Sequence, residues 1–291
     1  MLKNKNIIIF GGTGFVGEYL VKLLKGPGVQ IFVIYNGSLN KKEKVPGIKY
    51  YKLDLTKNIK WGPSTVKNLD IAVIMTQPND LIIRNIVKIL DQANNLKRII
   101  YTSTILVYPS SSKKIKETII PAPESPYEKG KIKEEESLTD HAKRRNIKLG
   151  IIRLANVYGN TKNRGIIGII FNSILNNKPL TVNGDGNQTR DYIFVEDAVK
   201  LINFLIFFGQ KNLVEIFNIC TGQGYTIQNL IKLTKKITKG EIDIKYGKPV
   251  KEKMFIVGDN KKILKVSKVK LSFDIIKGLK KTYLNYNYER I

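Results

Sequence analysis

The feature that most constrains the fold is a glycine-rich turn at residues 11–17 (GGTGFVG), directly after the apolar run 7–10 (IIIF). The short β-branched run predicts a buried strand, and residues 19–24 (YLVKLL) predict an amphipathic helix. Glycines between a strand and a helix let the backbone approach a pyrophosphate, and the helix N-terminus supplies N–H groups and a positive dipole. The order of these elements predicts a dinucleotide-binding βα unit.

Strands and helices are predicted to alternate along the first half of the chain. The predicted strands are 30–34, 49–53, 71–75, 98–102 and 149–153, and the predicted helices include 81–93 and about 125–145. This alternation predicts an α/β fold, a Rossmann-type doubly wound parallel sheet with a smaller C-terminal substrate-binding lobe. We expect an NAD(P)-binding Rossmann domain at 1–155, to which 190–220 return, and an interleaved substrate-binding lobe at 156–189 and 221–291.

Composition narrows the class of protein. The chain has 291 residues, 42% of them hydrophobic, and no apolar stretch approaches the roughly 20 residues that span a bilayer. We therefore expect a cytoplasmic protein without a membrane partner. Cys220, the single cysteine, lies in an apolar run and is predicted to be a core thiol. The net charge of +26 comes from lysines spread along the whole chain, which favours a solvated surface over a nucleic-acid site.

A tyrosine and a lysine provide candidate chemistry. Tyr127 and Lys131 are four residues apart on a predicted helix and therefore share one face. A phenol is a poor base at neutral pH, but a neighbouring ammonium lowers its pKa and makes it a usable acid/base. Thr104, which ends a predicted strand, offers a hydroxyl to hold the reacting substrate oxygen. The Tyr-x-x-x-Lys spacing alone is weak evidence, and it becomes strong because the pair follows the glycine turn and this strand end.

Further segments support this interpretation. With them the chain resembles the extended short-chain dehydrogenase/reductase family, specifically its NAD-dependent nucleotide-sugar epimerase/dehydratase group. The segments with this similarity are 153–159 (RLANVYG), 184–197 (GDGNQTRDYIFVED), 218–222 (NICTG), 259–262 (DNKK) and 278–283 (GLKKTY).

The resemblance implies roles for the matching positions. The catalytic residues would be Thr104, Tyr127 and Lys131, and the substrate-binding residues Thr104, Asn156 and Arg190, with Arg190 on the diphosphate of a nucleotide-diphosphate sugar. No metal is implied, and a homodimer is expected. The cofactor, NAD or NADP, would be held by Gly11, Gly14, Phe15, Val16, Gly17, Asn36, Asp54, Leu55, Thr76, Tyr127 and Lys131.

Three departures from the family pattern bear on the reaction and the cofactor. Ile105 and Leu106 stand where 4,6-dehydratases carry Asp-Glu, and their side chains transfer no protons, which argues against dehydration. The second strand ends at Asn36 without the acidic residue that binds a 2′-hydroxyl. Lys41 and Lys42 could meet a 2′-phosphate, whereas Asn36 could serve a 2′-hydroxyl, so both cofactors stay open. The segment 75–78 (MTQP) replaces the usual H-x-A-A.

The leading hypothesis is an NAD(P)-dependent nucleotide-sugar epimerase that oxidises and re-reduces C4 of the sugar. One alternative is an NADPH-dependent nucleotide-4-keto-sugar reductase. An alternative of another class is a non-catalytic NAD(P)-binding protein with a basic RNA-binding surface, and the joint presence of the candidate site residues argues against it. Residues 134–136 (EEE) are predicted to form a solvated helix face rather than a metal site, and His141, the only histidine, is given no catalytic role.

Overall fold

The computed structural model describes residues 5–40, 43–59 and 64–288. The chain forms two compact units. The first unit comprises Met1–Val107, Pro121–Arg153 and Val199–Phe217, and the second comprises Tyr108–Ile120, Leu154–Ala198 and Asn218–Ile291. These ranges differ from the expected domain ranges mainly at 108–120 and 190–198, which lie with the second unit. The assignment of one part to the cofactor and the other to the substrate stays a prediction.

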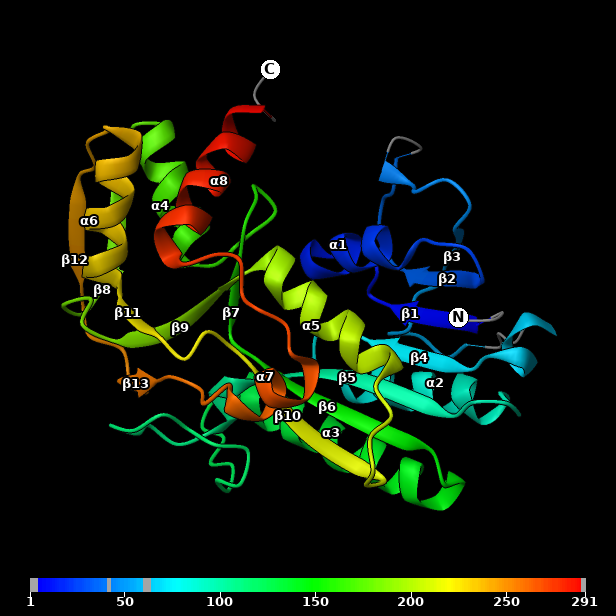
Figure 1. The fold of residues 1–291 in the computed structure, drawn as a ribbon. Coiled ribbons are helices and arrows are strands. Elements are labelled where there is room, and N and C mark those ends of the chain that lie inside the picture. The colour runs from blue at the N-terminus through cyan, green and yellow to red at the C-terminus, as the bar shows by residue number, and fades with distance from the viewer. Residues whose placement is uncertain (1–4, 41–42, 60–63, 289–291) are drawn as a thin grey trace. The chain divides into compact units, whose positions relative to one another are not determined.

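The first unit is built on the parallel sheet that the alternating pattern predicts. Seven strands lie in the order β10-β6-β5-β4-β1-β2-β3, and the sequential order reverses beside β1, as in a doubly wound sheet (Figure 1). The predicted fold class is confirmed. The strands are β1 (Lys5–Phe10), β2 (Val29–Tyr35), β3 (Lys49–Lys52), β4 (Ile71–Ile74), β5 (Arg98–Thr104), β6 (Lys148–Leu154) and β10 (Val214–Ile219).

Helices flank this sheet and bury its apolar residues. Ile7–Phe10 of β1 are almost fully buried, as both faces of a parallel sheet require. Helix α2 packs a buried stripe, Ile83, Ile86 and Ile89, into the same core. The helices of this part are α1 (Phe15–Leu24), α2 (Asp80–Asp91) and α3 (Pro126–Arg145), with short 3₁₀ turns at Ser64–Asn68 and Ile105–Val107.

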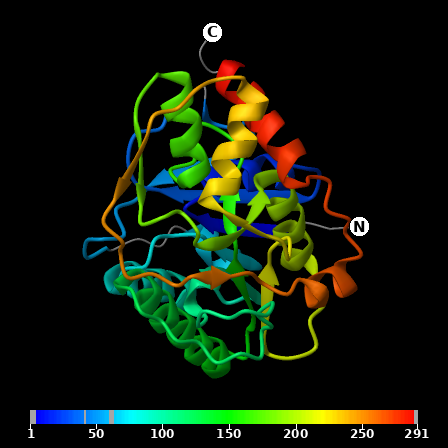
Figure 2. The same ribbon diagram turned by 90° about the vertical axis from the view of Figure 1, so that its left-hand side faces the viewer.

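The second unit contains smaller sheets and a group of helices. Its helices α4 (Ile166–Leu175), α6 (Ile227–Thr238) and α8 (Ile275–Tyr288) lie side by side (Figure 2). Strand β9 (Thr189–Phe194) pairs with β7 (Asn156–Tyr158), β11 (Gly224–Thr226) and β13 (Phe255–Ile256), and β8 (Leu180–Asn183) pairs with β12 (Ile244–Gly247). The remaining helices are α5 (Val195–Phe207), which runs from the second unit into the first, and α7 (Lys261–Ser267).

Buried acids from the family-like segments hold the second unit together. One oxygen of Asp191 accepts hydrogen bonds from the Thr221 N–H (2.9 Å) and hydroxyl (2.7 Å), and the other accepts from the Gly222 N–H (2.8 Å). Asp197 accepts from the N–H groups of Ser272 (2.8 Å) and Phe273 (2.9 Å). Asp191 and Asp197 therefore stabilise the fold of the second unit by accepting hydrogen bonds from its loops.

Two expectations from composition can be compared with the described residues. Cys220 is fully buried, as predicted, and burial raises the pKa of its thiol well above the ordinary value. In the described part of the chain, no helix combines the length and the apolar character that a membrane span needs.

Candidate active site

The glycine turn has the close-packed backbone that its sequence predicts. Gly11 has φ +83°, and a Cβ on it would lie 2.7 Å from the carbonyl oxygen of Met75. A Cβ on Gly17 would collide with the Gly11 carbonyl oxygen, and the Gly14 N–H donates to that oxygen at 3.1 Å. Glycine is therefore required at positions 11 and 17 of this turn, because any larger side chain would collide with the backbone at the end of β1.

The turn also leads into a helix end suited to an anion. Gly14 is the N-cap of α1, and it offers no side chain to bond the first-turn N–H groups of residues 15–17. These N–H groups and the helix dipole favour a phosphate at this position. The cradle formed by Gly11, Gly14 and Gly17 therefore fits the pyrophosphate of a dinucleotide.

The predicted adenosine-side residues lie at the ends of β2 and β3. The Asn36 amide donates to the Asp54 carboxylate at 3.1 Å, and hydrogen bonds from Thr56 lower the pKa of Asp54. Leu55 is buried, and its carbonyl accepts from the amide of Asn85 on α2 at 2.9 Å. Asn85 was not predicted as a site residue; its signal is a polar residue on the buried face of an apolar helix. Lys41 and Lys42 lie outside the described residues.

Lys131 joins the ends of two neighbouring strands. Its side chain is only 3% exposed, and its Nζ donates to the carbonyl oxygens of Thr76 and Thr102, each at 2.9 Å. The hydroxyls of Thr76 and Ser103 are buried here and have no hydrogen-bond partner among the described residues. Thr104 Oγ1 accepts from the Leu106 N–H at 3.2 Å. A buried ammonium and unpaired hydroxyls thus gather at the carboxyl ends of β4 and β5, where an α/β sheet binds its ligands.

Local sequence signals place Tyr127 in the first turn of α3. The Ser125 hydroxyl accepts from the Glu128 N–H at 3.2 Å as the helix N-cap, and Pro126 occupies the first helical position. A Cβ on Gly130 would lie 2.9 Å from the Cβ of Pro78, so a glycine here allows the close approach of this helix to residue 78. The Tyr127 side chain projects from this turn, with 38% of the residue exposed.

The pKa values of the pair differ from the sequence-based expectation. Burial, followed by the charge of Glu134, raises the pKa of Tyr127 above its ordinary value, whereas Lys131 was expected to lower it. Burial lowers the pKa of Lys131 to about 8, and Glu134 opposes this fall. The net shift of the Tyr127 pKa is thus opposite in direction to the effect expected of Lys131, because partial burial of the phenol and the Glu134 carboxylate both raise this pKa, and neither is visible in the sequence pattern.

The carboxylate responsible belongs to a segment predicted to be solvated. Glu134 is 1% exposed; one oxygen accepts from the Tyr101 hydroxyl at 2.5 Å, and the other accepts from the Asn79 N–H at 3.0 Å. Its Oε2 lies 3.7 Å from Lys131 Nζ. The prediction of a solvated face for residues 134–136 is wrong, because Glu135 is also buried, in an ion pair with Arg153 at 2.7 Å. Three consecutive helical residues cover more than half of the helix circumference, so some of them turn inward.

The predicted substrate residues Asn156 and Arg190 lie together in the second unit. Both line a cavity of about 400 Å³, with further walls from Asn163, residues 165–167, Tyr192 and Ile227. The side chain of Arg190 is 12% exposed, and its Nη2 donates to the Glu252 carboxylate at 2.7 Å. Glu252 was not predicted; it lies 62 residues along the chain from Arg190, in a loop without a local signal.

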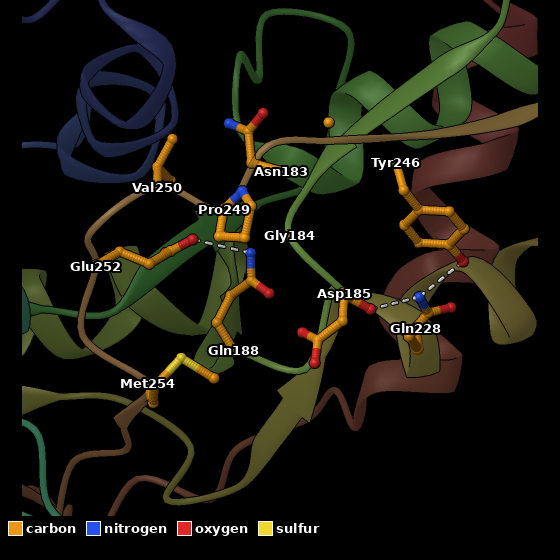
Figure 3. A pocket seen from close by; sticks show the side chains of 11 residues that line it. Asn183, Gly184, Asp185, Gln188, Gln228, Tyr246, Pro249, Val250, Glu252 and Met254 are labelled. Carbon is orange, nitrogen blue, oxygen red and sulfur yellow. Dashed lines mark hydrogen bonds between the residues drawn. The ribbon is translucent and has the colours of Figure 1, made fainter.

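A second cavity of about 630 Å³ lies in the same unit (Figure 3). Gln188 and Glu252 line both cavities. On the opposite side, the Gln228 amide donates to the Asp185 carbonyl at 2.8 Å and to the Tyr246 hydroxyl at 2.9 Å. Within the described ranges, no group of three or more histidine, cysteine, aspartate or glutamate side chains is arranged to hold a metal ion.

The chain is similar in sequence to curated proteins whose names state different reactions. The chain is 27% identical to a Methanocaldococcus jannaschii protein with the provisional name UDP-glucose 4-epimerase, over 84% of this chain and 86% of the relative. It is 25% identical to the dTDP-4-dehydro-6-deoxyglucose reductase of Escherichia coli, over 82% and 85%. An Arabidopsis thaliana UDP-glucuronic acid decarboxylase is 26% identical, and the match spans 59% of its length.

Solved structures share the fold. A Thermotoga maritima UDP-glucose 4-epimerase with UDP-glucose superposes with a TM-score of 0.84 at 23% identity, covering 98% of this chain and 100% of the other. A Bacillus cereus UDP-glucuronic acid 4-epimerase, in complex with NAD and a fluorinated UDP-sugar, gives a TM-score of 0.86 at 20% identity and covers 98% and 99%. The model of the NAD dependent epimerase/dehydratase family matches residues 7–220, which include the glycine turn, Tyr127, Lys131 and Arg190. By this match over most of its length, the chain belongs to the NAD dependent epimerase/dehydratase family.

Proposed function

We propose that the protein is a nucleotide-sugar 4-epimerase that uses NAD and acts on a UDP-sugar. The observation that carries this proposal is the buried ammonium of Lys131, which is held by the carbonyl oxygens of Thr76 and Thr102 one helical turn from Tyr127. An apolar side chain would pack at this position at a lower cost in free energy, because burying a charge is unfavourable. The buried lysine therefore indicates a chemical role rather than a packing role. The relatives with 4-epimerase in their names support the choice of reaction.

The residues of the first unit would carry the chemistry. The chemistry that a bound nicotinamide supplies is reversible hydride transfer at C4 of the sugar. Tyr127 would take the proton of the C4 hydroxyl and later return it, and the Thr104 hydroxyl would donate a hydrogen bond to the same oxygen. Lys131, with its charge kept in place by two carbonyls, would stabilise the phenolate form of Tyr127.

The cofactor residues support NAD over NADP. The ribose 2′-group of the adenosine would bind at the end of β2, where Asn36 lies, and the amide of Asn36 donates to the Asp54 carboxylate at 3.1 Å, which brings a negative charge near this position. A fixed negative charge accepts a hydrogen bond from a 2′-hydroxyl and repels a 2′-phosphate. Gly11, Gly14 and residues 15–17 would hold the pyrophosphate.

The residues of the second unit would hold the substrate. Arg190 would bind the diphosphate through its guanidinium, and Asn156 lines the same cavity and would touch the sugar nucleotide. Ile105 and Leu106 provide no acid or base beyond Thr104, which supports an epimerase over a dehydratase.

Mass spectrometry of the denatured protein, combined with a turnover assay, tests the proposal. We expect released NAD and interconversion of UDP-glucose with UDP-galactose, or of another C4-epimeric UDP-sugar pair, without added cofactor. A protein that shows no affinity for any dinucleotide in titration would contradict the whole assignment.

A reductase is the second candidate, and two observations favour it. The second strand ends without an acidic residue, and a reductase of a 4-keto-sugar is among the relatives. A reductase consumes its cofactor in every turnover, so it would be purified without dinucleotide and would oxidise added NADPH in the presence of a 4-keto-sugar nucleotide. An epimerase regenerates its cofactor and would oxidise none.

A further inference from the structure

Glu252 stands between the two cavities of the second unit. It lines both, and its two carboxylate oxygens have different partners. One accepts from the Gln188 amide at 3.0 Å, as Figure 3 shows, and the other accepts from Arg190 Nη2 at 2.7 Å. Glu252 is thus paired with the guanidinium of Arg190, the group that would bind the diphosphate in the proposed function.

The contact resembles the one that a phosphate would make. One oxygen of the Glu252 carboxylate accepts a charge-assisted hydrogen bond from the guanidinium, as a phosphate oxygen would. The other terminal nitrogen of Arg190, Nη1, donates to the Thr189 carbonyl at 3.0 Å. An oxyanion that binds to Arg190 at Nη2 therefore has to compete with Glu252.

The chain around Glu252 would let the carboxylate move. Residues 248–253 are irregular and join β12 to β13. The loop is tied at both ends, by the Gly184 N–H to the Gly247 carbonyl (3.2 Å) and by the Thr189 N–H to the Met254 carbonyl (2.7 Å). The side chain of Glu252 is 31% exposed, so it can turn away from Arg190 into solvent without disturbing either strand.

We propose that Glu252 is a built-in competitor for the substrate diphosphate at Arg190, and that it thereby sets the affinity for the nucleotide sugar. This inference rests on the proposed function, which places a nucleoside diphosphate at Arg190. The ligand has to release the ion pair before its phosphates contact the guanidinium, and part of its binding free energy is spent on that release. The nucleoside moiety, which carries no charge, is not subject to this competition.

Titration of the full-length protein, with its dinucleotide bound, tests the competition. The variant E252Q keeps the shape of the side chain and removes its charge, and the probes are UDP and uridine. We expect UDP to bind about two- to fivefold more tightly to E252Q than to the wild type, the size expected for relief of a partly exposed ion pair. Uridine, which lacks the diphosphate, should bind equally to both.

E241Q is the matched control. Glu241 belongs to the same unit, pairs with Lys235 and lines neither cavity, and its side chain is 87% exposed, so its replacement removes one charge without changing the cavity lining. We expect no change in UDP affinity for this variant. An equal gain in E241Q would identify a general charge effect and overturn the inference.

The other outcomes are equally decisive. If E252Q binds UDP no better than the wild type, or binds it less well, then Glu252 positions Arg190 rather than competing for it, and the inference fails while the proposed function stands. A gain for uridine as well as UDP would assign the effect to cavity shape and also overturn it. If neither protein binds UDP, the proposed function and the inference fail together.

Discussion

Replacement of Glu134 by glutamine should move the pH profile of turnover toward lower pH. Glu134 is buried, 3.7 Å from the Lys131 ammonium, and its charge acts on both members of the candidate pair. It raises the pKa of Lys131 against the effect of burial, and it adds to the rise in the pKa of Tyr127. Without this charge both groups lose their protons at lower pH.

The distance sets the size of the effect. Two unit charges 3.7 Å apart interact by on the order of 4 kcal/mol at an effective dielectric constant of about 20. This is an upper limit, because the glutamine amide oxygen keeps part of the interaction with the ammonium. Since about 1.4 kcal/mol corresponds to one pH unit, we expect the limb that follows Lys131 to move by about one to two pH units. In the wild type this limb should lie near the Lys131 pKa of about 8.

The assay is kcat measured from about pH 5 to pH 10 with saturating substrate and cofactor. The control is E136Q, because Glu136 is an exposed neighbour on the same helix and its loss changes the net charge equally. A profile of E134Q with lower activity but unchanged limbs would mean that Glu134 acts only in packing. A Lys131 limb that moved to higher pH would refute the electrostatic reasoning.

Three further substitutions separate chemistry from structure. Y127F should lower kcat by about 10²–10⁴-fold with dinucleotide affinity retained, and turnover near the wild-type rate would remove Tyr127 from the mechanism. G11A places a Cβ against the Met75 carbonyl at positive φ; we expect a loss of about 1–3 kcal/mol in the free energy of unfolding and weaker NAD binding, by chemical denaturation and titration. D197A removes the oxygen that accepts from the N–H groups of 272–273 and should cost about 1–3 kcal/mol of stability while kcat per folded molecule stays constant; a selective loss of kcat would contradict a structural role.

The elements that were predicted correctly are those whose signals lie in residues close together in the sequence. The glycine turn follows an apolar run, and α3 begins at a serine N-cap with proline in the first helical position. The helix predicted at about 125–145 is found at Pro126–Arg145, where Asn146 ends it in the left-handed conformation. Several short strands of the second unit, such as β11 and β13, were not predicted, because two or three residues are too few for a periodic pattern.

The sequence also identified segments without distinguishing their roles. In the segment 184–197, Arg190 lines a cavity, whereas Asp191 and Asp197 are buried acceptors that hold loops of the second unit. All three are charged residues in one family-like segment, and no local pattern separates a ligand contact from a buried fold contact. The distinction depends on which way each side chain points once β9 has formed.

The sequence by itself determined the parallel doubly wound sheet, the close-packed glycine turn and the shared helix face of Tyr127 and Lys131. These features follow from residues a few positions apart, and local geometry converts them directly into structure. Tertiary structure alone decided the direction of the Tyr127 pKa shift, the burial of Glu134 and the pairing of Arg190 with Glu252. The physical reason is that charge and solvation act through space, so the state of an ionisable group depends on residues that only folding brings near it.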